Sequence, residues 1–209
     1  MAYIRTKICG ITNIADALCA AENGADAIGL VFFAKSPRCV SIETAQEIVQ
    51  QMPAFVSVVG LFVNQNADEI QRIINSVPLD YLQFHGDETP EFCQQFNRPY
   101  IKAVRVQHEH DIQAALNAYP TARALLFDAY HPQQYGGSGE HFDWDMLPEK
   151  INRPWILAGG LNPDNVIAAI SQTNAVAIDL SSGVEKDKGI KDHSKIKQLM
   201  QTIKGFQAA

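Results

Sequence analysis

The interpretation of the fold starts from residues 155–185, WILAGGLNPDNVIAAISQTNAVAIDLSSGVE. The apolar run WILA ends in two glycines, a helical spacing of apolar residues follows the Asn-Pro turn, and a second run, AVAIDL, ends in SSG. The pattern predicts a strand, a glycine loop, a helix, a second strand and a loop of small residues. Strands that alternate with helices in this way predict a parallel sheet.

The two loops of this segment predict a phosphate-binding site. Glycine at the carboxyl end of a strand lets a ligand approach the backbone, and N–H groups near a helix N-terminus attract anions. Either loop alone could be an ordinary tight turn. Two in succession near the end of the chain match the phosphate site that follows strands seven and eight of an eight-stranded barrel. The residues concerned are Gly159, Gly160, Ser181, Ser182 and Gly183.

The composition fits one soluble domain of the α/β class. The 209 residues are 46% hydrophobic and 19% charged, which is enough for a large core, and α/β barrels reach this length as single domains. The formal net charge is −6. Nucleic acids and anionic membranes bind to basic faces, so neither is expected as a partner. An anionic small molecule would require the few basic residues to gather at its site.

The cysteines and the N-terminus indicate a reducing compartment. Cys9, Cys19, Cys39 and Cys93 follow neither a CxxC nor a metal-finger spacing, so we expect free thiols. Cys19 and Cys93 fall in helical patterns and are expected to behave as small hydrophobic residues. The start, MAYIRTKICG, lacks the apolar run of a signal peptide, and no apolar stretch is long enough to span a bilayer. We expect a cytoplasmic protein, either a monomer or a homodimer.

Eight apolar segments alternate with eight helical ones along the chain. The expected strands are residues 4–9, 27–32, 56–63, 81–85, 100–105, 124–128, 155–158 and 175–180. The expected helices are residues 14–22, 43–51, 68–75, a segment after Thr89-Pro90, 109–118, 144–147, a segment around 166–170, and 193–203. Near-continuous apolar strands are typical of sheets covered on both faces. We therefore expect a single-domain (β/α)8 TIM barrel over residues 1–209. The competing doubly wound open sheet usually carries its glycine fingerprint in the first βα turn.

Chemistry in such a barrel comes from the carboxyl ends of the strands, where Cys9 follows Lys7 on the same face of the first strand. A nearby ammonium lowers the pKa of a thiol, so a thiolate of Cys9 near neutral pH could act as a base or as a nucleophile. No histidine is evidently placed to activate it, which favours a general base. The alternative is that Cys9 is a small buried hydrophobic residue.

Asp128 ends the sixth expected strand after four apolar residues. A carboxyl at the edge of an apolar interior tends to have a raised pKa and can donate a proton, although an aspartate here could also cap the next turn. Asp179 could act in the same way or could orient Lys7, and we expect it to support the catalytic residues.

Lys7 and Asp179 are also candidates for substrate binding, together with three further residues. Arg38 and Arg105 offer planar, permanently charged groups suited to carboxylate or phosphate, although Arg38 could equally be a solvated loop residue. His85 ends the fourth expected strand, where a structural role is the more common one. No paired His, Asp or Glu spacing at the strand ends suggests a metal site. The long loop after Asp128 is a candidate lid and contains Gly136, Gly137, Ser138 and Gly139.

Seven motifs together resemble the phosphoribosylanthranilate isomerase family of tryptophan biosynthesis, over essentially the whole chain. They are KICGIT, GLVFFAKSPR, LQFHGDE, LLFDA, GGSG with FDW, LAGGLNPDNV and DLSSGVE, in this order. The chain departs from the family pattern after SSGVE, where the family often has a proline before the next glycine and this chain has Lys188 before Gly189.

The resemblance implies an Amadori rearrangement without a cofactor, from N-(5-phosphoribosyl)anthranilate to 1-(2-carboxyphenylamino)-1-deoxyribulose 5-phosphate. It implies that Cys9 is the general base, that Asp128 is the general acid and that Arg38 engages the anthranilate carboxylate. It also places the phosphate on the loops after strands seven and eight. Two other functions remain open. One is a different sugar-phosphate barrel enzyme, such as an indole-glycerol-phosphate synthase, and the other is a barrel that binds a phosphorylated metabolite as a regulator.

Overall fold

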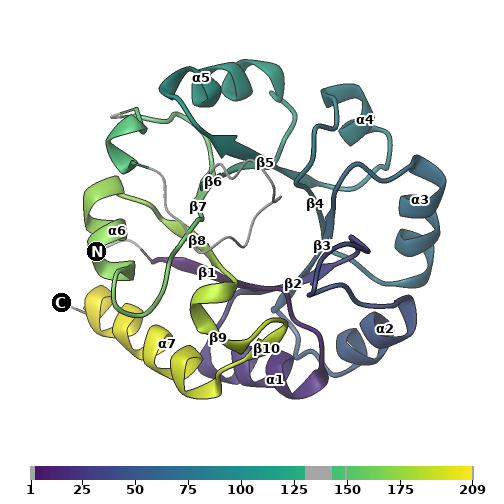
Figure 1. Cartoon of the computed structure of the whole chain (residues 1–209), viewed down its shortest axis with the longest axis horizontal. Helices are drawn as coiled ribbons and strands as arrows, with labels where there is room; N and C mark the ends of the chain where they lie inside the picture. Colours follow the sequence, from purple (N-terminus) through teal and green to yellow (C-terminus); the bar gives the residue numbers. More distant parts are fainter. Residues whose placement is uncertain (1–2, 130–142, 149, 209) are drawn as a thin grey trace.

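The computed structural model describes residues 3–129, 143–148 and 150–208, and it confirms the expected barrel. Eight parallel strands form a closed ring in sequence order, with β1 paired to both β2 and β8 (Figure 1). The strands are β1 (Arg5–Cys9), β2 (Ala27–Val31), β3 (Ser57–Phe62), β4 (Tyr81–Phe84), β5 (Tyr100–Val106), β6 (Ala124–Ala129), β7 (Trp155–Leu157) and β8 (Ala177–Leu180).

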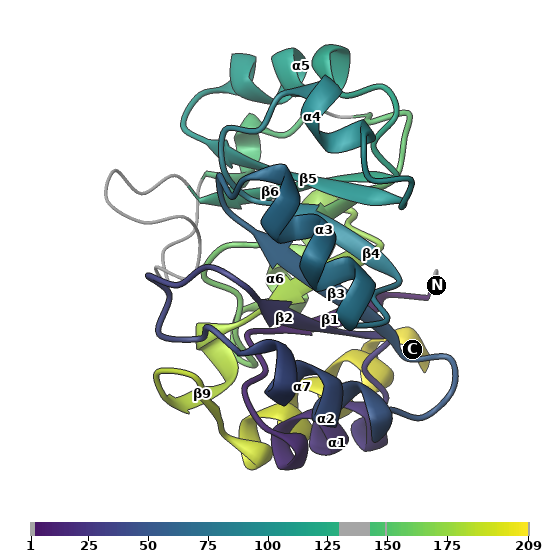
Figure 2. The same cartoon turned by 90° about the vertical axis from the view of Figure 1, so that its right-hand side faces the viewer.

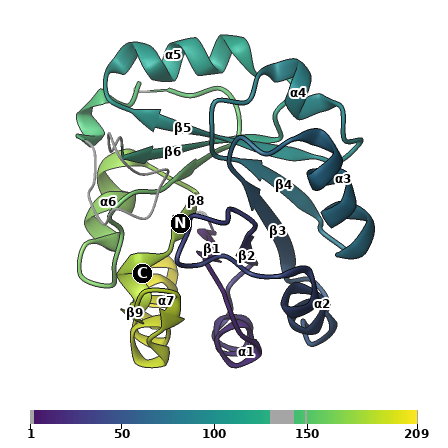
Figure 3. The same cartoon turned by 45° about the vertical axis from the view of Figure 1, so that its right-hand side comes forward.

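Helices surround this ring, and Figure 3 shows α3, α4 and α5 outside strands β3 to β6. The helices are α1 (Ile14–Asn23), α2 (Ile42–Gln50), α3 (Ala67–Ser76), α4 (Pro90–Gln94), α5 (Glu109–Ala118), α6 (Val166–Thr173) and α7 (His193–Ala208). The expected helix at residues 144–147 is instead a single 3₁₀ turn, η1 (Trp144–Met146), so the described part of the chain has seven α-helices rather than eight.

The helix starts follow from local chemistry. Asn13, Ser41, Asn66 and Thr89 each precede a helix and accept a hydrogen bond from a backbone N–H in its first turn. These side chains satisfy donors that the helix itself leaves unpaired. The expected Thr89-Pro90 start of α4 is confirmed, with proline in the first turn where no N–H is needed.

The core has an inner and an outer part. Inside the ring lies a layer with several alanines, formed by Val59, Ile101, Ala103, Ala124, Leu126 and Ala158. The larger part fills the space between strands and helices and includes Ile8, Ile28, Leu82 and Phe127, all fully buried. Burial on both faces explains why the strands read as continuous apolar runs.

The two ends of the barrel differ. Figure 2 shows the loops that follow the strands on one side of the molecule and both chain termini on the other. After β8 the chain forms a short 3₁₀ turn, η2 (Ser182–Val184), and an unexpected antiparallel hairpin of β9 (Glu185–Asp187) and β10 (Ile190–Lys191). No helix in the described ranges is both long and apolar enough to cross a membrane. The four cysteines are free, as expected.

Candidate active site

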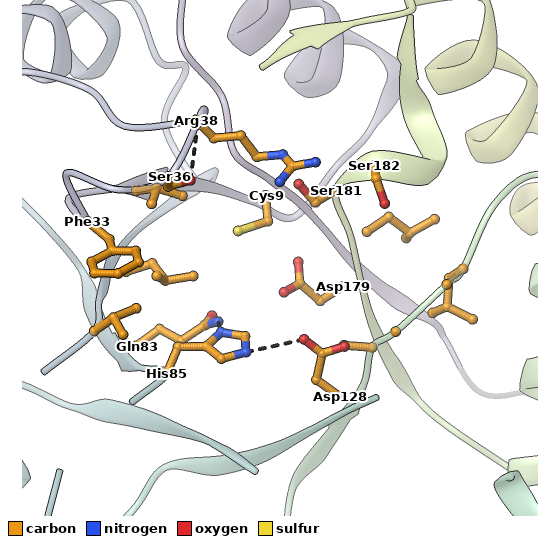
Figure 4. A pocket seen from close by; sticks show the side chains of 18 residues that line it. Cys9, Phe33, Ser36, Arg38, Gln83, His85, Asp128, Asp179, Ser181 and Ser182 are labelled. Carbon is orange, nitrogen blue, oxygen red and sulfur yellow. Dashed lines mark hydrogen bonds and ion pairs between the residues drawn. The ribbon is translucent and has the colours of Figure 1, made fainter. Parts of the chain in front are cut away.

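A cavity opens at the carboxyl end of the barrel, where residues of β1 to β4, β6 and β8 and of the loop after β7 converge (Figure 4). Cys9 and Asp128, far apart in sequence, both line it, and Asp179 lies between them in this view. The predicted site residues in its lining are Cys9, Arg38, His85, Asp128, Gly159, Gly160, Asp179, Ser181 and Ser182.

Cys9 lies in an apolar layer at the mouth of the barrel, beside Val31, Leu61 and Val63. Burial raises the pKa of the Cys9 thiol, Lys7 lowers it and Asp179 raises it, with a net increase above the ordinary value. The expectation that Lys7 would make thiolate accessible near neutral pH is therefore wrong, because the net shift of the Cys9 pKa is upward. The ammonium acts in the expected direction, but the loss of water outweighs it.

The space for this thiol comes from Gly29, the residue of β2 that pairs with Cys9 in the parallel ladder. A Cβ atom at this position would lie 2.7 Å from the Cys9 Sγ. Atoms do not pack at that distance, so the glycine is required for the thiol to point where it does.

Lys7 and Asp179 form a buried ion pair below the thiol, with 2.7 Å between Lys7 Nζ and Asp179 Oδ1. Burial alone would lower the pKa of Lys7, but Asp179 and Cys9 together hold it above its ordinary value. Burial raises the pKa of Asp179 more than Lys7 lowers it. Asp179 therefore orients Lys7, one of the two roles expected for it, while Lys7 itself lies outside the cavity lining.

Asp128 contacts a histidine across the cavity. Its Oδ2 lies 3.2 Å from Nε2 of His85, and its Oδ1 accepts a hydrogen bond of 2.9 Å from the backbone N–H of Ala129. The other ring nitrogen of His85 lies 3.2 Å from Nε2 of Gln83. An amide N–H donated to Nδ1 leaves the ring proton on Nε2, facing Asp128.

The loops after β7 and β8 form the part of the cavity expected to hold phosphate. Gly159 and Gly160 have positive φ angles, of 85° and 61°, which other residues rarely adopt. The carbonyl of Gly160 accepts a hydrogen bond of 3.0 Å from the side chain of Asn165. In the second loop, Ser181 and Ser182 line the cavity, and the Ser181 hydroxyl is buried without a partner among the described residues.

Gly183 has a packing role instead. It does not line the cavity, and a Cβ atom there would lie 1.9 Å from the carbonyl oxygen of Leu161. The two loops are therefore pressed together at this glycine.

Arg38 reaches the cavity with one edge of its guanidinium already engaged. Its Nε and Nη2 each lie 2.8 Å from an oxygen of Glu185, in a two-pronged ion pair. Burial alone would lower the pKa of Arg38, but Glu185 outweighs this effect and raises it. Arg38 is thus a fixed, charged group at the site and not a solvated loop residue.

Arg105 was expected to bind substrate, but its side chain does not reach the cavity. It is absent from the cavity lining, and its Nη2 lies 2.7 Å from Oδ1 of Asp87 at the protein surface. Strand position alone placed it at the barrel mouth, but a long side chain can turn toward a loop carboxylate that sequence does not locate. The expected lid residues Gly136, Gly137, Ser138 and Gly139 lie outside the described residues.

Three residues at or behind the site were not predicted. Gln83 lies two residues before His85 on β4, so strand alternation could have indicated that both side chains face the cavity. Glu185 ends the quoted DLSSGVE motif, but its contact with Arg38 spans 147 positions of sequence. Lys191 lies in the unexpected hairpin, and no motif or spacing in the sequence indicated that it would lie near the site.

The other end of the barrel is also hollow, but neither the Cys9 thiol nor the Asp128 carboxyl lines it. At that end, Asp26 accepts hydrogen bonds from the Tyr3 hydroxyl at 2.9 Å and from the backbone N–H of Thr6 at 2.8 Å. Across the described ranges, no three His, Cys, Asp or Glu side chains are grouped to hold a metal ion. The thiol, the carboxyl group and the two loops expected to hold phosphate meet at the carboxyl end, which is therefore the candidate active site.

Comparison with known proteins identifies the family of this chain. Residues 6–202 match the family model described as N-(5'phosphoribosyl)anthranilate (PRA) isomerase. The chain is 57% identical over 202 residues to N-(5'-phosphoribosyl)anthranilate isomerase of Neisseria meningitidis serogroup A, with 97% of each chain covered.

Solved structures give the same result. Phosphoribosyl anthranilate isomerase from Thermotoga maritima matches with a TM-score of 0.89 and 42% identity, covering 97% of this chain and 99% of that one. A phosphoribosyl anthranilate isomerase in complex with reduced 1-(o-carboxyphenylamino)-1-deoxyribulose 5-phosphate matches with a TM-score of 0.83 and 40% identity, at 97% and 99% coverage. With this fold, this cavity and these matches over nearly its whole length, the chain belongs to the N-(5'-phosphoribosyl)anthranilate isomerase family.

Proposed function

We propose that this protein isomerises N-(5'-phosphoribosyl)anthranilate in tryptophan biosynthesis, with Asp128 as general acid and Cys9 as general base. The observation that carries the proposal is the convergence of this carboxyl and this thiol on one cavity bordered by two anion-binding loops.

The cavity suits a substrate with an anionic group at each end. The compound bound to the solved relative has a carboxylate on its aromatic ring and a phosphate on its sugar. In this chain Arg38 provides a fixed guanidinium for the carboxylate. The loops containing Gly159, Gly160, Ser181 and Ser182 provide backbone and hydroxyl donors for the phosphate. Holding both ends orients the sugar carbons between Cys9 and Asp128.

In the first step, Asp128 donates a proton to the furanose ring oxygen. The C1–O bond breaks, the nitrogen lone pair forms a C=N bond, and the sugar opens to a cationic iminium. His85 faces the carboxyl oxygen Oδ2, where it holds the acid in place and stabilises the carboxylate that remains after the transfer.

In the second step, the thiolate of Cys9 removes the proton from C2, and the electron pair of that C–H bond forms a C=C bond and neutralises the iminium. The resulting enolamine tautomerises to the ketone. Burial raises the pKa of the Cys9 thiol and Lys7 lowers it. The positive charge of the iminium also favours the thiolate, which is the form of Cys9 that this step requires.

Turnover of N-(5'-phosphoribosyl)anthranilate by the purified protein tests the proposal. The fluorescence of this substrate should decay on addition of the protein, without any added metal or cofactor. A protein that binds the compound but leaves its fluorescence unchanged would be a binding protein, and the proposed activity would be rejected.

A further inference from the structure

The β9–β10 hairpin carries two buried ionisable groups for which the catalytic scheme above has no role. Lys191 Nζ lies 2.9 Å from Glu185 Oε1, and the two side chains are 0% and 6% exposed. A charge removed from water to this extent needs close polar partners, so such a pair is costly to bury in a short surface hairpin. The partners of each group lead to opposite ends of the candidate substrate site.

Glu185 leads to the carboxylate end. Its two oxygens accept from Nε and Nη2 of Arg38, which fixes the plane of the guanidinium and leaves the opposite edge for another ligand. Burial alone would raise the pKa of Glu185, but Arg38 and Lys191 together lower it, so the carboxylate stays charged.

Lys191 leads to the phosphate end. Its Nζ donates to the backbone carbonyl of Ser181, at 3.1 Å. In a planar trans peptide the carbonyl and the next N–H point in opposite directions. Holding the Ser181 carbonyl toward Lys191 therefore turns the N–H of Ser182 away from it, and Ser182 lines the cavity. Burial lowers the pKa of Lys191 overall, and in either protonation state its N–H groups can donate to Ser181.

The hairpin is also fixed to the barrel from behind. The backbone N–H of Lys191 donates to Asp16 Oδ2 in α1, at 2.8 Å, and the hydroxyl of Thr12 in the loop after β1 donates to the carbonyl of Gly189, at 2.5 Å. Glu185 and Lys191 are thus held rigidly relative to the strand that carries Cys9.

We propose that Glu185 and Lys191 are positioning residues that couple the two ends of the substrate site. Glu185 orients Arg38 toward the substrate carboxylate, and Lys191 orients the Ser182 N–H toward the substrate phosphate. This inference rests on the proposed function in so far as it assumes a ligand with these two groups.

The test measures the binding of each end separately by calorimetry, which does not depend on turnover. The probes are anthranilate, inorganic phosphate and reduced 1-(o-carboxyphenylamino)-1-deoxyribulose 5-phosphate. We expect E185Q to weaken anthranilate binding about tenfold with a smaller effect on phosphate, and K191M to weaken phosphate binding about tenfold. Both variants should bind the two-ended compound less tightly and raise KM more than they lower kcat.

Lys188→Met is the matched control, because it removes the same charge from an exposed position of the same hairpin. K191M is expected to fold because Glu185 stays paired with Arg38. If K191M does not fold, the double variant E185Q/K191M replaces it in the measurement, because it removes both buried charges together. Unchanged binding of anthranilate and of phosphate in folded E185Q and K191M would overturn the inference. Equal losses of binding in E185Q, K191M and the control K188M would overturn it as well. Failure of the wild type to turn over substrate would reject the proposed function alone.

Discussion

At the scale of single residues, the balance at Cys9 sets how the site can work. The thiol is buried in an apolar layer, with an ammonium and a carboxylate close by that shift its pKa in opposite directions. The proposed proton abstraction by Cys9 requires its thiolate, which Lys7 favours and which burial and Asp179 disfavour. The Lys7–Asp179 pair adjusts this balance, with Asp179 in the cavity lining and Lys7 behind it.

The opposite signs of these two charges give a prediction. Lys7 lowers the pKa of Cys9 and Asp179 raises it, so K7M should move formation of the Cys9 thiolate to higher pH and D179N should move it to lower pH. The measurement is the rate of iodoacetamide modification of Cys9 against pH, followed by peptide mass spectrometry because the other cysteines are also free. Unchanged pH profiles in both variants would show that burial alone controls the thiol, and shifts in the same direction would contradict the opposing effects of the two charges.

Removing the proposed acid or base should slow the chemical step and leave the fold intact. We expect C9A and D128N each to reduce kcat by about 10²–10⁴-fold, the usual contribution of a general acid or base. D128N keeps an oxygen that can accept from the Ala129 N–H. C19A, which removes a thiol from α1 outside the cavity, is the matched control. Turnover close to wild type in C9A or D128N would remove that residue from the mechanism.

Arg38 should act mainly on binding. Because its guanidinium is fixed by Glu185 before substrate arrives, R38A is expected to raise KM at least tenfold with a smaller change in kcat. R38K keeps the charge but loses the two-pronged contact, so it should restore only part of the affinity. Steady-state kinetics decide the matter, and an unchanged KM in R38A would remove its proposed contact with the carboxylate.

At the scale of elements, the β1–β2 ladder positions the thiol. Cys9 pairs with Gly29, and a Cβ atom at position 29 would lie 2.7 Å from Sγ and 3.1 Å from the Cys9 Cα. We therefore expect G29A to displace the thiol and to lower kcat at least tenfold. G205A is the control, because a Cβ atom there meets nothing within 4 Å and alanine is the better helix former. Equal kinetics in the two variants would contradict the packing argument.

The elements also show what sequence could and could not predict. The eight strands and the start of helix α4 were predictable, because buried parallel strands are continuous apolar runs and because Thr89-Pro90 is a local signal for a helix start. Strand β8 begins at Ala177 rather than at residue 175, since an apolar run does not reveal where pairing with β1 starts. The hairpin, EKDKGIK, is mostly polar and is held by contacts with Asp16, Arg38 and Ser181 that sequence does not reveal.

At the scale of the whole molecule, the proposed phosphate loops follow β7 and β8, the neighbouring strands with the fewest paired residues. This junction between β7 and β8 is called the seam of the barrel below. Strands β5 and β6 share six registered residue pairs, whereas β7 and β8 share one, Leu157 with Ile178. The loops that follow these two strands meet where Gly183 packs on the carbonyl of Leu161. A ligand that binds both loops therefore bridges the two strands with the fewest backbone contacts. Few backbone pairs between neighbouring strands favour local opening, so this seam should exchange its amide hydrogens early.

Phosphate binding should consequently protect this seam more than the rest of the barrel. We expect inorganic phosphate to slow amide hydrogen exchange most in peptides covering residues 155–161 and 177–183, and less in those of β3 and β4. At a concentration 100 times its dissociation constant, phosphate would also stabilise the fold by about 2.7 kcal/mol. Hydrogen exchange with mass spectrometry, with and without phosphate, makes the comparison, and G183A serves as a variant in which the two loops cannot pack. Equal protection of all eight strands, or a local effect that persists in G183A, would show that bound phosphate does not bridge β7 and β8.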